Sequence, residues 1–294
     1  MTTAFHKKPN MYTSHLQLKV RNLESSVAFY KTILGFDVLE QDGNTVYLTH
    51  DNKSSMLSLV EQADAISHQG YAGLYHIAFL LPTRKDLGNI IQHFIAHDVR
   101  VGAGDHDVSE ALYLNDPDGN GIEIYSDRPK EDWRWDGSDQ VYMTTEQLNV
   151  PSILADADGQ WNGLPAGTVI GHVHLSVADL AASEKFYTQV LDFEVVTRYG
   201  GQALFISTGK YHHHLGMNTW HSAGRPARPE NATGLVAYTV VLKDEAYAAS
   251  VRTALEAASA EVSVVADAPK YGGAQAFSTV DPNGIRIIFT VDGE

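Results

Sequence analysis

Apolar and polar residues alternate with a period of two at several places in the chain, and a helical spacing follows a few residues later. In residues 14–20 every second residue is apolar, which predicts a strand with one buried face. Val27, Tyr30 and Leu34 then recur at helical spacing after an Asn-Leu pair that can begin a helix. Short β-rich segments separated by Gly or Asn turns come next. The local unit is therefore predicted to be βαβββ.

This unit occurs four times, near residues 14–60, 73–126, 171–220 and 234–291. Residues 14–38 align with 171–195 without a gap, and residues 73–126 align more weakly with 234–290. In the second and fourth units, the turn sequences DPDG and DPNG precede the last strand. We therefore predict an α+β fold of four βαβββ modules. The predicted division is a first domain at 10–128, a connector rich in Asp, Gly, Pro and Trp at 129–168, and a second domain at 169–292.

Composition excludes several classes of function. The 294 residues carry a net charge of -15 with scattered Lys and Arg, which argues against nucleic acid as a partner. No apolar run approaches the ~20 residues that span a bilayer, and the first residues lack the apolar segment of a secretion signal. The chain has no cysteine, so any bound metal must be held by His, Asp or Glu. We expect a cytoplasmic protein with neither a membrane nor a nucleic acid as its partner.

Three consecutive histidines, His212, His213 and His214, stand out in the third unit. They lie in a stretch that is otherwise predicted to form a strand, with Leu215 and Met217 following as apolar residues. Side chains alternate along a strand, so His212 and His214 are predicted to point to one face and His213 to the other.

Several of these segments resemble the vicinal oxygen chelate superfamily, which includes glyoxalase I, bleomycin-resistance proteins and extradiol dioxygenases. The matching sequences are GLYHIAFLLP (73–82), NDPDGNGIEIYS (115–126), GHVHLSVADL (171–180) and YHHHLGMNTW (211–220). They are most similar to the ring-cleaving branch of catechol-2,3-dioxygenase type. The resemblance implies two domains of two modules each, with a metal site in a curved mixed sheet.

The resemblance also implies a ligand set. The superfamily takes one His from the first strand of a module, a second from the first strand of its partner, and a Glu from the partner's last strand. The matching residues are His76 and Glu123 in the second unit, His172 in the third and His15 in the first. The fourth unit has Ala237 and Ile288 at these positions, so we do not expect it to bind metal.

The choice between His172 and His15 depends on how the modules pair. Extradiol enzymes take a basic His from a later strand of the module that supplies the first ligand. The third unit has the histidine run there, whereas the first unit has Ser-Met-Leu at 55–57. The resemblance therefore favours His76, Glu123 and His172 as ligands, with His214 as the base and His212 beside it in the substrate pocket. Sequential pairing, with His15 in place of His172, is the alternative.

The activity implied is Fe(2+)-dependent extradiol cleavage of a catechol-type diol, with both atoms of O2 incorporated. Mn(2+) or another divalent metal is the alternative cofactor. Tyr113 would donate a hydrogen bond to the substrate oxygen, and His106 would line the ring pocket. The expected partners are a small aromatic diol and O2, and a homodimer could form through edge strands. Competing functions are a glyoxalase-like metal enzyme, a hydroquinone dioxygenase and a metal-free binding protein of the bleomycin-resistance type.

Overall fold

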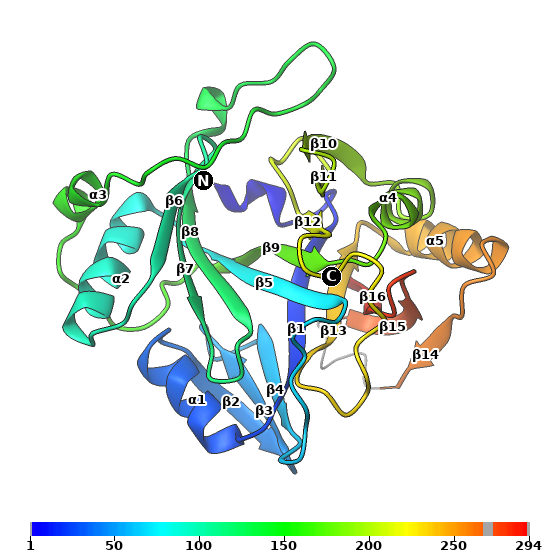
Figure 1. The fold of residues 1–294 in the computed structure, drawn as a ribbon, viewed down its shortest axis with the longest axis horizontal. Coiled ribbons are helices and arrows are strands. Elements are labelled where there is room, and N and C mark those ends of the chain that lie inside the picture. Colours follow the sequence, from blue (N-terminus) through cyan, green and yellow to red (C-terminus); the bar gives the residue numbers. More distant parts are fainter. Residues whose placement is uncertain (1, 267–272, 293–294) are drawn as a thin grey trace.

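A computed structural model describes residues 2–266 and 273–292, and it contains four βαβββ modules (Figure 1). The first module contains β1 (Tyr12–Val20), α1 (Leu23–Thr32), β2 (Asp37–Asp42), β3 (Thr45–Thr49) and β4 (Leu57–Glu61). The second contains β5 (Gly73–Leu80), α2 (Arg84–Ala96), β6 (Gly102–Asp105), β7 (Ser109–Asn115) and β8 (Gly121–Asp127). The predicted α+β class and the repeated unit are confirmed for this half of the chain.

The second half repeats the same order of elements. The third module contains β9 (Val169–Ser176), α4 (Leu180–Gln189), β10 (Glu194–Tyr199), β11 (Ala203–Ser207) and β12 (Leu215–Asn218). The fourth contains β13 (Gly234–Leu242), α5 (Glu245–Ala257), β14 (Ser263–Val265), β15 (Gly273–Val280) and β16 (Arg286–Asp292). Residues 267–272 of the fourth predicted unit lie outside the described residues. Within the described residues, three short helices lie outside the modules: η1 (Thr2–Phe5), η2 (Lys130–Asp132) and α3 (Val150–Asp156).

The modules pair across the two halves of the chain. One eight-stranded sheet has the order β14-β15-β16-β13-β1-β4-β3-β2, and the other has the order β10-β11-β12-β9-β5-β8-β7-β6. The first sheet therefore joins modules one and four, and the second joins modules two and three through the antiparallel pair β5 and β9. Each of the stretches 10–128 and 169–292 contributes one module to each sheet. The second module therefore pairs with the third and not with the first, which is the pairing that the histidine run favoured.

The same local signal starts all four of the module helices. The side chains of Asn22, Thr83, Asp179 and Asp244 each accept a hydrogen bond from the backbone N–H three residues further on. Such a cap contributes about 1 kcal/mol to helix stability. The Asn-Leu and Asp-Leu pairs of the repeat therefore fix where helices α1 and α4 begin.

The DPDG turn between β7 and β8 is held by its own first aspartate. Asp116 Oδ1 accepts hydrogen bonds from the backbone N–H groups of Asp118 and Asn120, both at 2.9 Å. Asp281 makes the equivalent bonds in the fourth module. The first aspartate of each turn therefore has a structural role, because its side chain holds the backbone of the turn.

Alternating side chains separate the core of the second sheet from its other face. On β5, Ile77 and Phe79 lie in the main hydrophobic core, whereas Ala78 and Leu80 belong to a separate small cluster. On β8, Ile122 and Ile124 lie in the main core. Because side chains alternate along a strand, the polar residues between these positions share the opposite face. That face carries the candidate site.

None of the helices in the described part of the chain has the length and apolar character needed to span a membrane.

Candidate metal centre

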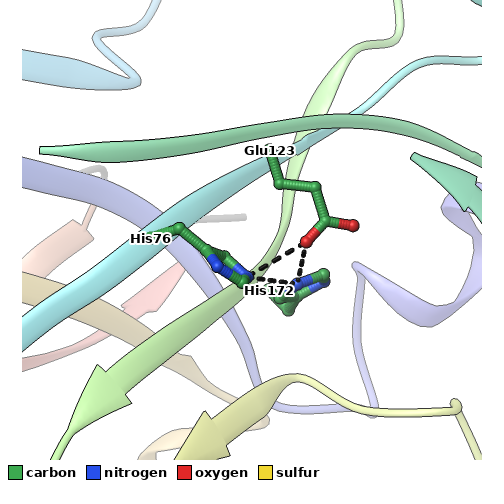
Figure 2. A group of neighbouring side chains, drawn as sticks. All are labelled: His76, Glu123 and His172. Atoms are coloured by element: carbon green, nitrogen blue, oxygen red, sulfur yellow. Dashed lines mark hydrogen bonds and ion pairs between the residues drawn. The ribbon is translucent and has the colours of Figure 1, made fainter. Parts of the chain in front are cut away.

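Three adjacent strands bring His76, Glu123 and His172 together on one face of the second sheet. His76 lies on β5, Glu123 on β8 and His172 on β9, and β5 lies between the other two. Ala78 is the register partner of both Glu123 and His172. The short side chain at position 78 leaves the space above β5 open to the longer side chains on either side. Figure 2 shows the three side chains converging on one point.

The distances between the converging atoms are short. Glu123 Oε2 lies 3.0 Å from His76 Nε2 and 3.1 Å from His172 Nε2. The two imidazole Nε2 atoms are 3.3 Å apart. These are the only three residues in the described ranges 2–266 and 273–292 that form such a group of His, Asp or Glu.

The donor set and the spacing both fit a divalent metal ion. Two imidazoles and one carboxylate on one face are the ligands of the facial triad, which leaves the remaining positions for substrate. Cis ligands at about 2.1 Å from an ion in an octahedral site lie about 3.0 Å apart. The observed separations are close to that value, so a metal could be held without moving the backbone.

Burial sets the protonation states of the cluster. Burial lowers the pKa of His172 to about 4, with Glu123 opposing that shift. Burial alone would raise the pKa of Glu123, but His172 and His76 outweigh it and hold that pKa well below its usual value. A neutral imidazole and an ionised carboxylate are the forms that bind metal.

The cluster lies at the inner end of a cavity of about 450 Å³. Glu123 is only 2% exposed, whereas Tyr75, Tyr199 and Trp220, which line the same cavity, are 36%, 56% and 38% exposed. Because exposure increases from Glu123 to these aromatic side chains, the cluster lies at the floor of the cavity and the aromatic rings lie at its mouth. Among the described residues, Glu123 is the only acidic side chain in the lining, which includes no Lys or Arg from that part of the chain.

The two residues predicted before the last strand also line this cavity. The Nδ1 atom of His106 donates to the Thr144 carbonyl at 2.7 Å, and the Tyr113 hydroxyl lies 2.6 Å from His106 Nε2. Because a neutral imidazole carries one proton, Nε2 is the acceptor and Tyr113 is the donor. Burial, followed by the nearby Glu123 carboxylate, raises the pKa of Tyr113 well above its usual value. Tyr113 therefore keeps its proton and donates it to His106.

The prediction that His214 and His212 face the cluster is wrong. His214 directs Nε2 to the Phe5 carbonyl at 3.1 Å and Nδ1 to the Ser207 hydroxyl at 3.0 Å. His212 directs Nε2 to Asp127 at 2.8 Å. Neither lines the cavity, whereas His213 does, and its ring centroid lies 4.0 Å from that of His172.

The backbone explains why the predicted alternation fails. Strand β12 begins only at Leu215, so the histidine run lies in a loop, where side chains need not alternate. Gly209 and Lys210, directly before it, have φ values of 64° and 58°. These left-handed residues turn the chain just ahead of the run, and the side-chain directions there are set by the turn.

His15, the alternative ligand, lies on the other sheet. Its strand, β1, pairs with β13 and β4 rather than with β5 or β8. Burial lowers the pKa of His15 to about 3. It belongs neither to the cluster nor to the cavity lining.

Several residues around the site were not anticipated from the sequence. Tyr125 and Asp127 follow Glu123 on the same face of β8, and His174 follows His172 on β9. The sequence could have indicated them, because residues two positions apart on a strand share a face with the proposed ligand. Trp220 lies at the mouth of the cavity.

Comparison with known proteins agrees with the fold. Residues 13–124 and 169–289 match the model of the Glyoxalase/Bleomycin resistance protein/Dioxygenase superfamily. The chain is 45% identical to a catechol-2,3-dioxygenase of Bacillus subtilis over 244 residues, which cover 82% of this chain and 85% of that one.

Solved structures with low sequence identity share this fold. Glyoxalase I from Zea mays matches with a TM-score of 0.57 and 13% identity, over 95% of this chain and 92% of that one. A Bacillus subtilis protein matches with a TM-score of 0.68 and 14% identity, over 98% and 87% of the two chains.

Proposed function

The chain belongs to the glyoxalase/bleomycin resistance protein/dioxygenase superfamily and is a homologue of catechol-2,3-dioxygenase, and from this premise we propose that it is a metal-dependent extradiol dioxygenase. Its substrate would be an aromatic diol of catechol type, and O2 would be the second substrate. We further propose Fe(2+) as the metal. A cytoplasmic location and a homodimer remain predictions.

One observation carries the proposal. His76, Glu123 and His172 converge at the floor of a cavity large enough for a small aromatic ring. A purely apolar binding pocket would have no need of two imidazoles and a carboxylate buried within 3.3 Å of one another. Buried polar groups of this kind are costly unless they have a partner such as a metal.

The metal would be held by Nε2 of His76, Nε2 of His172 and Oε2 of Glu123. When bound, it would supply positive charge and adjacent open positions that bring the diol and O2 together. The remaining steps depend on the protein's own side chains.

His213 is the residue we propose as the base. It lines the cavity beside His172, and burial, followed by the neighbouring His172, lowers its pKa well below the usual value. A neutral imidazole can accept a proton from a diol hydroxyl near neutral pH. His213 thus takes the role that the sequence assigned to His214.

Tyr113 is proposed to contact the substrate oxygen with its hydroxyl. Its bond to His106 fixes the hydroxyl at the wall of the cavity. His106 is itself fixed by the Thr144 carbonyl. The pair would orient the diol, with His106 acting through Tyr113 as well as lining the pocket.

The lining of the cavity favours a neutral diol. In the part of the chain that the structure describes, no Lys or Arg side chain lines the cavity to pair with a carboxylate on the ring, and an unpaired buried charge is costly. The aromatic side chains at the mouth, Tyr75, Tyr199 and Trp220, suit an apolar substituent. We therefore propose catechol or an alkyl- or aryl-substituted catechol.

The activity can be tested by loading the protein with Fe(2+) under anaerobic conditions, adding catechol and then admitting O2. Extradiol cleavage predicts O2 uptake together with the yellow absorbance of a semialdehyde product. Glu123→Ala is the matched control because it removes a proposed ligand. No uptake with catechol or any of its neutral derivatives would refute the proposal.

A further inference from the structure

A buried aspartate, Asp127, lies at the end of β8 on the same face as Glu123. Its side chain is fully buried. Its Oδ1 atom accepts hydrogen bonds from His212 Nε2 at 2.8 Å and from the Tyr211 hydroxyl at 3.2 Å. Within residues 2–266 and 273–292, no Lys or Arg lies within ion-pair distance of this carboxylate. A buried carboxylate with only these partners requires an explanation.

The first branch from Asp127 leads to His213. A carboxylate only accepts hydrogen bonds, so His212 must carry its proton on Nε2. With a single proton on the His212 ring, its Nδ1 atom is then an acceptor. The Nδ1 atom of His213 lies 2.8 Å from it and must be the donor. His213 is thereby left with an unprotonated Nε2, which is the form that a base requires.

The second branch leads to His172. Because the Tyr211 hydroxyl donates to Asp127, the Tyr125 hydroxyl, 2.8 Å away, donates to Tyr211. The oxygen of Tyr125 then accepts from His172 Nδ1 at 3.3 Å. His172 is thus also left with an unprotonated Nε2, the atom that faces Glu123.

A glycine makes the second branch sterically possible. A Cβ atom at position 171 would lie 1.8 Å from the hydroxyl oxygen of Tyr125. Gly171 precedes His172 on β9, so the absence of a side chain there lets Tyr125 reach the adjacent imidazole. Both branches therefore start at one carboxylate and end on two imidazoles whose ring centroids are 4.0 Å apart.

We propose that Asp127 is a positioning residue that sets the tautomers of His213 and His172, acting through His212 on one side and through Tyr211 and Tyr125 on the other. Its carboxylate is the common acceptor toward which every proton of the network is ordered. The consequence for turnover rests on the proposed function. The ordering of protons does not, because it follows from the hydrogen-bond distances and from one proton on each imidazole ring.

The tautomers can be read directly by ¹⁵N NMR of protein labelled on histidine. Zn(2+)-loaded protein is suitable because the filled d shell of Zn(2+) is redox-silent and diamagnetic. Resonances among the 14 histidines are assigned with His212→Gln and His213→Gln. The expected spectrum shows His213 protonated on Nδ1 and unprotonated on Nε2. A parent protein with His213 protonated on Nε2 would overturn the proposal.

Two substitutions of Asp127 distinguish a role in positioning the imidazoles from a role in packing alone. Asp127→Ala removes the acceptor, so the His213 tautomer is expected to become mixed and kcat to fall about 100-fold. In Asp127→Asn the amide oxygen can accept both bonds, so the tautomer is retained and kcat stays within about tenfold of the parent. KM changes by less than about threefold in both variants. Asp139→Asn, which removes an exposed carboxylate paired with Lys210, is the charge control.

The outcomes separate this proposal from the proposed function. If the parent turns over no diol, the proposed function fails while the spectrum still tests the network. If Asp127→Ala leaves both the tautomer and kcat unchanged, Asp127 has no positioning role. If Asp127→Ala does not fold, the tautomers of the parent and of Asp127→Asn decide the question.

Discussion

The imidazole of His213 lies against that of His172, with ring centroids 4.0 Å apart, whereas the neighbouring His214 points to the Phe5 carbonyl. Adjacent residues in one histidine run thus face different environments. His213 faces the cavity with the proposed metal ligands, and His214 helps to anchor the N-terminal segment. The two can be distinguished experimentally.

His213→Ala should reduce kcat by about 10²–10⁴-fold, the usual range for loss of a general base. Metal content should be unchanged because His213 is not a proposed ligand. His214→Ala should instead lower the thermal midpoint, since it breaks the bonds to Phe5 and Ser207, and leave kcat within about threefold. Steady-state kinetics and thermal unfolding of both variants check this. A larger loss of kcat in His214→Ala than in His213→Ala would contradict the assignment.

Metal affinity should depend on His172 and not on His15. His172→Ala, like His76→Ala and Glu123→Ala, should weaken Zn(2+) binding by at least about 100-fold, because a ligand matters more than the outer contacts that cost 10–100-fold. His15→Leu should bind Zn(2+) within about twofold of the parent, since His15 lies on the other sheet. Titration calorimetry measures all four. Loss of binding in His15→Leu with retention in His172→Ala would refute the ligand set.

A carboxylate on the ring should be disfavoured. Because no Lys or Arg of residues 2–266 and 273–292 lines the cavity, 3,4-dihydroxybenzoate should have a kcat/KM at least about tenfold below that of 4-methylcatechol, since burying an unpaired charge costs free energy. The two substrates have similar size, so the comparison isolates charge. Equal kcat/KM values would show that a cation reaches the bound ring.

Stability should fall as the pH drops below the ordinary pKa of histidine. Burial lowers the pKa of His15 to about 3, so between that value and ~6.5 only the unfolded chain binds this proton. The folded state is therefore favoured above pH 6.5 and loses this contribution progressively as the pH falls. His6 and His172, with pKa values of about 4, act in the same direction.

Replacing His15 should remove one of these contributions. In His15→Leu, the loss in free energy of unfolding between pH 7 and pH 5 should be smaller by about 2 kcal/mol than in the parent. Urea titrations at the two pH values measure the difference. An identical pH dependence in the two proteins would mean that His15 is not buried in its neutral form.

Local patterns were sufficient to predict the modules. Caps such as Asn22 and Asp179 and turns such as that of Asp116 act over a few residues, so the sequence reports them directly. The pairing of β5 with β9 depends on contacts about 100 residues apart, and the repeat alone left His15 and His172 as alternatives. The sheet order then separated them.

The orientation of the histidine run could not be predicted from strand periodicity. Gly209 and Lys210 have positive φ values, and they turn the chain ahead of the run. A lysine rarely adopts a positive φ, so the sequence does not predict this turn. The network of Asp127, Tyr211 and Tyr125 was missed for another reason. Its members come from strand β8 and a distant loop, so only the folded chain shows that they meet.

The most direct test of the dioxygenase assignment uses isotopically labelled O2. Fe(2+)-loaded protein is mixed with catechol under labelled O2, and the ring-cleaved product is analysed by mass spectrometry. The account predicts that both oxygen atoms of O2 enter one product molecule, and that Glu123→Ala gives none. Ring cleavage without any label in the product would contradict it, whereas loss of one labelled atom is accounted for by exchange of the aldehyde oxygen with water.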